Sequence, residues 1–226
     1  MPVEVGGSEN VLELGSDPTG RVIINGSNCI LRVGRNVTLD ATVIIQKDVS
    51  NAVIEIGDGC VIDGMIRIVR GNGGRIRIGD ATTFNQVGMS MHESGAITIG
   101  RDCMLSTDIH MDVSDMHPIF DMTTGHRLNP PQDITLGDHV WLSTRVLVLK
   151  GANIGSGTIV GAGSMVVGTL PENVLAIGSP ARVVRENVIW TRLMDEQPEI
   201  PPASTATRKP SWREMLTPNR RPVDQS

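Results

Sequence analysis

The chain has 226 residues, of which only 2% are aromatic, with no Tyr at all against 25 Gly and 13 Pro. A net charge of -5 provides no basic excess for neutralising phosphates, which argues against a nucleic-acid-binding protein. Three Cys far apart in sequence do not form a disulfide framework, which argues against a small protein stabilised by disulfides. Neither a signal peptide nor an apolar run near the ~20 residues of a membrane span is present, so we expect a cytoplasmic protein without a transmembrane segment.

A short motif, aliphatic-x-aliphatic-Gly, recurs between residues 12 and 137. It reads LELG, LRVG, IEIG, IRIG, ITIG and ITLG, starting at residues 12, 31, 54, 76, 97 and 134. A unit of six residues, grouped by three into coils of eighteen, explains the spacings if short insertions bulge out at corners. The repeat predicts an all-β fold, a parallel β-helix over residues 1–185 with large aliphatic side chains pointing inward.

Small or β-branched residues occur four positions after the Leu, Val or Ile that precedes the glycine. These residues are Val37, Cys60, Thr82, Cys103, Val140 and Thr158. We expect them to point inward beside the corners, which makes Cys60 and Cys103 packing residues rather than reactive thiols. Gly or Asp just after the motif is typical of a corner that needs positive φ or local side-chain hydrogen bonds.

The spacing of 37 between the last two motif copies leaves about 19 residues beyond one coil. This extra segment, 115–133, reads DMHPIFDMTTGHRLNPPQD and contains His117 and His126. We expect it to project from the prism as a loop, and long excursions from a regular scaffold tend to be functional.

The repeat pattern ends at about residue 186. Residues 186–197 are predicted to form a short helix that caps the open end of the prism and buries Ile189, Trp190 and Leu193. Residues 198–226 are rich in Pro, which favours an extended or disordered tail in an isolated subunit.

Three segments in order, SDMHPIFDMTTGHRLNPPQDITLGDHVW, LKGANIGSGTIVGAGSMV and AIGSPARVVR, resemble the hexapeptide-repeat acetyltransferases. The likeness covers roughly residues 54–185 and is greatest to bacterial capsule and polysaccharide O-acetyltransferases, including those acting on polysialic acid; galactoside and maltose acetyltransferases are more distant. It implies a left-handed β-helix, a homotrimer with active sites between neighbouring subunits, acetyl-CoA as co-substrate and a carbohydrate acceptor.

The same resemblance assigns roles to individual residues where the motifs coincide. The family's catalytic His opens the projecting loop in a His-Pro pair, which here is His117, and a neutral imidazole suits a general base for a sugar hydroxyl. Trp141, 24 residues later, would wall the site and hold acceptor or pantetheine, unless it only covers the outer face. Asn85 would contact the acceptor, with a local turn role as the alternative. His126 is a further acceptor candidate.

Contacts to CoA are implied beside the last coils. The matching residues are Thr144, Ala162, Val167, Gly168, Arg182 and Arg185. The two Arg could pair with CoA phosphates, or could be a solvated corner. Relatives often carry Lys where this chain has Gly168, so one phosphate contact is expected to be missing.

Other functions remain as alternatives. The runner-up is an N-acyltransferase of a nucleotide sugar or a drug-modifying acetyltransferase, and a non-catalytic assembly or sugar-binding β-helix is a third possibility. A trimeric zinc carbonic anhydrase needs two His five apart in one coil, which the sequence does not contain, so no metal site is expected. We expect His92 and His110 on corners or outer faces and His139 in the turn before Trp141.

Overall fold

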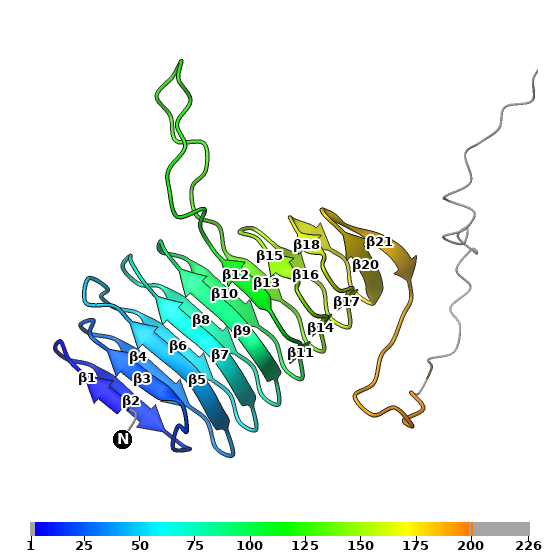
Figure 1. Ribbon diagram of the computed structural model, residues 1–226, viewed down its shortest axis with the longest axis horizontal. Helices are drawn as coiled ribbons and strands as arrows, with labels where there is room; N and C mark the ends of the chain where they lie inside the picture. Colours follow the sequence, from blue (N-terminus) through cyan, green and yellow to red (C-terminus); the bar gives the residue numbers. More distant parts are fainter. Residues whose placement is uncertain (1–2, 199, 201–226) are drawn as a thin grey trace, which may run out of the picture.

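The computed structural model describes residues 3–198 and 200, which form one long prism of stacked coils with a single arm projecting from it (Figure 1). None of the described residues is in a helix, and all strands along the prism pair in parallel except the last. The solenoid of parallel strands predicted from the repeat is therefore confirmed. The predicted Pro-rich tail lies outside the described residues except for Pro198 and Ile200. No helix long and apolar enough to cross a bilayer occurs in this described part.

Each coil contributes strands to three faces of the prism. Face 1 is the eight-stranded sheet of β2 (Val11–Leu14), β4 (Ile30–Val33), β6 (Val53–Ile56), β8 (Arg75–Ile78), β10 (Ala96–Ile99), β13 (Ile134–Leu136), β16 (Asn153–Ile154) and β19 (Thr169–Leu170). Face 2 holds β11 (Met104–Leu105), β14 (Trp141–Leu142), β17 (Ile159–Val160) and β20 (Val174–Gly178). Face 3 holds β1 (Val3–Val5), β3 (Arg21–Ile24), β12 (Ile109–Asp112), β15 (Leu147–Val148) and β18 (Met165–Val166).

Three long strands run across faces 2 and 3 without a break, namely β5 (Thr38–Ile45), β7 (Val61–Ile68) and β9 (Thr83–Met91). We call the corners edge 1–2, edge 2–3 and edge 3–1 after the faces they join. The chain passes through them in that order in every coil. The final strand, β21 (Ala181–Glu186), turns back and pairs antiparallel with β20.

The core is a set of aliphatic ladders. Because side chains alternate along a strand and the coils stack in register, equivalent residues lie above one another about 4.8 Å apart. On face 1 one buried ladder runs through Leu31, Ile54, Ile76, Ile97 and Ile134. A narrow interior filled this way has little room for aromatic rings, which explains the composition.

The small residues predicted to lie beside edge 1–2 are all buried, as expected. Cys60 and Cys103 are free thiols whose Sγ atoms lie 3.2 Å from the carbonyl oxygens of Gly79 and Gly137 in the next coil. Burial raises the pKa of the Cys103 thiol to about 11. The interpretation of these thiols as packing residues is confirmed, since a reactive Cys needs a low pKa and exposure.

Stacking requires glycine where one backbone closely approaches the next, as at Gly64 in β7. Its φ is +130°, and a Cβ there would lie 2.2 Å from the carbonyl oxygen of Val87. We predict that Gly64→Ala lowers the urea midpoint of unfolding far more than Gly59→Ala, whose φ is +68° but whose Cβ would meet nothing within 4 Å. The control, Gly59→Ala, should lower the free energy of unfolding by about 1 kcal/mol from backbone strain alone. Equal shifts in the two variants would contradict this account of the stacking.

The insertion predicted over 115–133 does project, as an arm that leaves the prism at edge 3–1 between β12 and β13 (Figure 1). Its base is closed by a hydrogen bond from Gln132 N to Val113 O, 2.9 Å. Beyond the base the two strands of the arm pair antiparallel through Phe120 and Arg127. This segment is therefore an ordered hairpin rather than a simple bulge.

The predicted capping helix over 186–197 is wrong. The chain leaves β21 with Asn187 at a φ of 55°, and the segment that follows runs without regular structure back onto edge 1–2. Trp190 is buried at 6% exposure, as predicted, but Ile189 and Leu193 are exposed. Contacts of the Trp190 ring with His139, described below, hold this segment in an extended path that a helix could not follow.

Candidate functional site

The base of the arm is fixed to the prism by a charged cluster at edge 3–1. Arg127 donates two hydrogen bonds of 2.7 Å to the carboxylate of Glu93, and Ser114 Oγ donates a third of 2.5 Å. Glu93 lies between β9 and β10, one coil before the arm. These bonds, Arg127 first and Ser114 second, lower the pKa of Glu93 to about 2. Because the arm itself does not stack on another coil, this cluster holds its base in place against the preceding coil.

Asn129 ties the two strands of the arm together beside His117. Its buried side chain donates from Nδ2 to the backbone oxygen of His117 and to Asp115 Oδ2, both at 2.9 Å, and accepts from Ile119 N at 2.6 Å. Lys150 contacts the same Asp115 Oδ2 at 2.6 Å. The hydrogen bonds from Lys150 and Asn129 lower the pKa of Asp115. The backbone of His117 is therefore clamped from two sides.

The imidazole of His117 is exposed on this clamped backbone. Among the described residues its ring makes no hydrogen bond, so both nitrogens can meet a substrate. A general base needs reach to the proton it removes, and a fixed backbone with a free ring supplies that. The geometry is consistent with the predicted role of His117, which stays a prediction.

A groove of about 370 Å³ lies at the foot of the arm, beside His117. Its walls come from edge 3–1 of two earlier coils and from the arm itself, namely Arg70, Gly71, His92, Glu93, Ser94, Met116, Pro118 and Arg127. Arg70 is exposed and, within the described part of the chain, forms no ion pair. The groove therefore offers a free cation to an acidic group.

His92 is a groove residue that the sequence did not single out. It lies on a corner, as predicted, but its side chain is only 10% exposed, and its Nδ1 contacts the carboxylate of Asp112. A His oriented by a carboxylate is a common arrangement in proton transfer. No sequence signal distinguished it, because whether a corner residue points in or out depends on the length of each insertion. No three metal-binding side chains gather anywhere in the described residues.

Trp141 lies on face 2, away from the arm. It points outward from β14, half-buried, with Met104 and Ile159 as its neighbours in the coils on either side. Face 2 is the face opposite edge 3–1, where the arm leaves the prism. A single chain therefore does not bring His117 and Trp141 together.

The other predicted site residues lie on two different edges. Asn85, Thr144 and Ala162 lie along edge 2–3, with Asn85 two coils before Thr144 and Ala162 one coil after it. Ser106, in the coil between Asn85 and Thr144, has its Oγ 3.2 Å from Thr144 Oγ1. Val167 and Gly168 lie on edge 3–1, after the coil that carries the arm. His126 is exposed on the arm near its tip, and Arg182 and Arg185 are exposed on β21. His110 is exposed on face 3 and His139 precedes β14, both as predicted.

The anchoring of the arm should depend on pH in the acid range. The pKa of Glu93 falls from 4.5 to about 2 on folding, so its ion pair contributes fully above pH ~5 and is lost as the pH falls through about 2. We expect the Leu128 amide, which donates to Ile119 O, to lose hydrogen-exchange protection across this window after correction for intrinsic rates. In Glu93→Gln the protection should be lower at neutral pH and should depend less on pH, because only the Asp115 carboxylate then still titrates among the bonds at the base of the arm. Identical profiles for both proteins would contradict the anchor.

No protein-family model matches the sequence. The polysialic acid O-acetyltransferase of Neisseria meningitidis is 33% identical over 175 residues, which cover 75% of this chain and 74% of that protein. That of Escherichia coli O1:K1 / APEC is 34% identical over 125 residues, but these span only 41% of its length and 55% of this chain. The crystal structure of the polySia-specific acetyltransferase NeuO superposes with a TM-score of 0.77 at 34% identity, covering 86% of this chain and 84% of that one.

Proposed function

This chain belongs to the hexapeptide-repeat acetyltransferase family that includes the polysialic acid O-acetyltransferases, and from that premise we propose that it moves acetyl from acetyl-CoA to a sugar hydroxyl. The acceptor we propose is a capsular or surface polysaccharide. The observation that carries this proposal is the ordered arm, which presents a free imidazole beside a groove. Since acetyl-CoA is a cytoplasmic metabolite, we place the reaction in the cytoplasm.

In the proposed reaction His117 acts as the general base. Its neutral imidazole removes the proton of the acceptor hydroxyl while the oxygen attacks the thioester carbonyl. The tetrahedral intermediate then collapses to an ester, the carbon–sulfur bond breaks, and the imidazolium returns its proton to the leaving thiolate. No acyl-enzyme is needed, so acetyl passes directly within a ternary complex.

We propose that the acceptor is an acidic sugar bound in the groove at the foot of the arm. Arg70 supplies an unpaired guanidinium, and planar guanidinium–carboxylate pairs are strong and oriented. The relatives' names point to polysialic acid, whose sugar carries a carboxylate.

The acetyl-CoA site that we propose draws on both edges named above. Cβ atoms built on Gly163 and Gly168 meet nothing within 4 Å, so the backbone there is open to a thin pantetheine arm. Thr144 and Ala162 are on one edge and Val167 on another, so two chains side by side could supply one cleft. Arg182 and Arg185 would pair with the phosphates.

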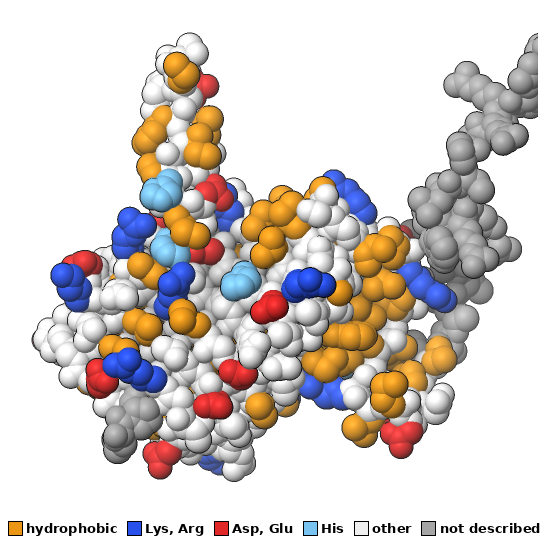
Figure 2. Space-filling model, viewed as in Figure 1, with side chains coloured by type: hydrophobic (Ala, Val, Ile, Leu, Met, Phe, Trp, Pro, Cys, Tyr) orange, Lys and Arg blue, Asp and Glu red, His pale blue; other side chains and the backbone are white. Residues whose placement is uncertain are grey.

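A homotrimer would complete this site. The arm exposes large apolar side chains that a monomer leaves in water, including Ile119, Phe120 and Leu128 at 54%, 55% and 60% exposure (Figure 2). Solvated apolar surface of this kind marks a protein interface. Seated on a neighbouring chain, the arm would carry His117 to that chain's Trp141.

This assembly predicts a clear mutational result. Ile119→Asp together with Phe120→Asp should reduce the mass measured by light scattering from three times 24.3 kDa to that of one chain, with loss of activity. Each buried side chain of this size contributes about 2 kcal/mol, and a buried unpaired carboxylate costs more. The matched control, Val5→Asp with Val11→Asp, places two charges on exposed apolar residues of the first coils and should stay trimeric. A trimer in both variants would contradict the interface.

An acceptor screen tests the activity itself. Acetyl-CoA turnover is followed by thiol release on adding acidic and neutral glycans, and NMR locates the acetyl group. We expect turnover with a carboxylate-bearing glycan, weakened selectively by Arg70→Ala, and a product ester that mild alkali cleaves. An alkali-stable amide would instead show an N-acyltransferase, and binding without turnover would show a non-catalytic protein.

A further inference from the structure

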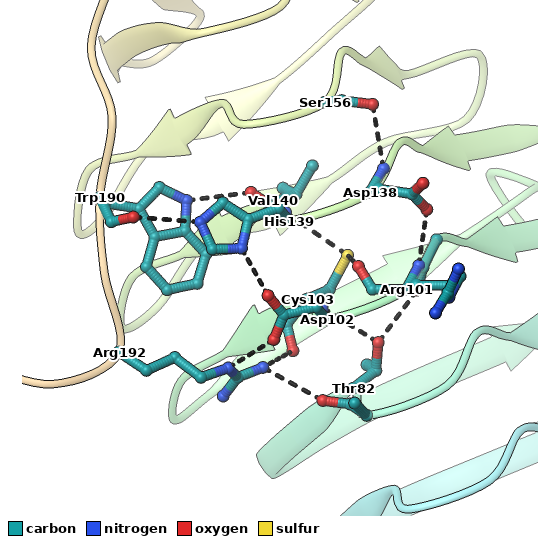
Figure 3. A network of polar contacts seen from close by, with 12 residues as sticks. Thr82, Arg101, Asp102, Cys103, Asp138, His139, Val140, Ser156, Trp190 and Arg192 are labelled. Atoms are coloured by element: carbon teal, nitrogen blue, oxygen red, sulfur yellow. Dashed lines mark hydrogen bonds and ion pairs between the residues drawn. The ribbon is translucent and has the colours of Figure 1, made fainter. Parts of the chain in front are cut away.

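The segment after β21 is fixed to the prism by specific contacts rather than lying loosely on it. We call residues 188–192 the strap. Val188 N donates to Asn173 O at 2.9 Å, and from there the strap runs back along edge 1–2 toward earlier coils (Figure 3).

Trp190 and His139 are joined by stacking of their rings and by contacts between each ring and the other residue's backbone oxygen. Trp190 Nε1 donates to His139 O at 2.9 Å, while His139 Nε2 lies 3.1 Å from Trp190 O. The two rings stack with centroids 3.9 Å apart and an interplanar angle of 7° (Figure 3). The other ring nitrogen of His139 is 2.7 Å from Asp102 Oδ2. Every polar atom of both rings thus has a partner, which fixes the Trp190 ring in one orientation.

Arg192 extends the attachment across two more coils. Its guanidinium donates to Asp102 Oδ1 at 2.7 Å, Thr83 Oγ1 at 3.0 Å and the backbone oxygens of Cys103 and Ala81 at 2.9 and 3.2 Å. Burial raises the pKa of Asp102, but hydrogen bonds from Arg192 and His139 outweigh it and leave that pKa lowered. Trp190 and Arg192 together therefore join the strap to three successive coils at one edge.

The Trp190 ring also contacts Trp141. Their centroids are 5.9 Å apart at an angle of 47°, within the range of favourable tilted aromatic pairs. The stacking neighbours of Trp141 on face 2 are the flexible Met104 and the aliphatic Ile159, neither of which fixes the plane of an indole. Trp190, only 6% exposed, is the rigid surface beside it.

We infer that Trp190 is a positioning residue, which sets the orientation of the Trp141 ring at the active site. The inference rests on the proposed role of Trp141 in holding acceptor or pantetheine. Ordering a freely rotating ring when substrate binds costs conformational entropy, whereas a ring that is already fixed in the free enzyme incurs no such cost. The strap thus couples the end of the β-helix to the chemistry on face 2.

A double-mutant cycle tests this inference, with kcat and KM measured for Trp141→Ala, Trp190→Ala and the double variant. If Trp190 acts through Trp141, Trp190→Ala should lower kcat/KM about tenfold, mainly through KM, and should have no further effect when Trp141 is already Ala. Trp190→Phe keeps a ring against Trp141 and should stay within about threefold of wild type. Ile189→Ala, in the same strap but exposed, is the control and should have wild-type kinetics.

The outcomes separate the inference from the proposed function. If Trp141→Ala retains full activity, the proposed role of Trp141 fails and the inference fails with it. If Trp141→Ala is impaired but Trp190→Ala has wild-type kinetics, the inference is wrong and the strap has only a structural role. The same holds if Trp190→Ala lowers kcat/KM by the same factor in wild type and in Trp141→Ala. If Trp190→Ala does not fold, Trp190→Leu is used in its place, because Leu fills the space without an aromatic face. Equal KM values for Trp190→Leu and Trp190→Phe would also overturn the inference.

Discussion

Replacing His117 with Ala should lower kcat by about 100-fold or more while leaving the trimer and acetyl-CoA binding intact. A positioned general base contributes about 10²–10⁴-fold, and its removal leaves the hydroxyl to lose its proton to water. The cost in stability should be within about 0.5 kcal/mol, because the side chain is exposed and its ring has no partner in the described structure. The fall in rate would then be chemical.

Two companion variants sharpen this test. Met122→Ala changes a fully exposed side chain near the arm's tip and should leave kcat unchanged. His92→Ala removes the carboxylate-oriented His of the groove. If His92→Ala abolishes turnover and His117→Ala does not, the base is His92, and the arm serves only to cover the acceptor.

The repeat made the prism predictable because a solenoid repeats one local rule. Each copy of the Gly motif places the same residue types on the same face, so the inward position of Cys103 followed from the spacing alone. The arm was predictable for the same reason, since an insertion shows as a departure from a fixed period. What could not be predicted depended on pairs of residues from different coils.

The failed helix and the unrecognised His92 both illustrate this limit. Ile189, Trp190 and Leu193 have a spacing that a helix could use, but the partner of Trp190 is His139, 51 residues earlier in the chain. His92 meets Asp112 from the next coil, at a corner where the number of residues varies. Neither partner is marked by a local pattern. In the 186–197 segment the tertiary contact of Trp190 overrode the local preference for a helix, and at His92 no sequence signal indicated that the side chain is buried.

The spacing of His117 and Trp141 misleads in a different way. Only 24 residues separate them, yet the structure places them at an edge and on the face opposite to it. Sequence distance says nothing about which copy of a chain completes a site. Their separation within one chain is therefore the strongest structural reason to look for the active site between chains.

Mixing two inactive variants should restore activity if the site is shared. His117→Ala keeps Trp141, and Trp141→Ala keeps His117, so a trimer containing both can pair an intact arm with an intact face 2. In a closed ring with random assembly at equal amounts, each interface has about a one in four chance of pairing two intact halves. Co-expression under two affinity tags, followed by purification through both, should therefore yield specific activity on the order of a quarter of wild type or somewhat more. Each variant purified alone should stay at its own low rate. If doubly tagged trimers form and remain as inactive as either parent, then His117 and Trp141 do not meet across subunits, and the arm must serve the chain from which it projects.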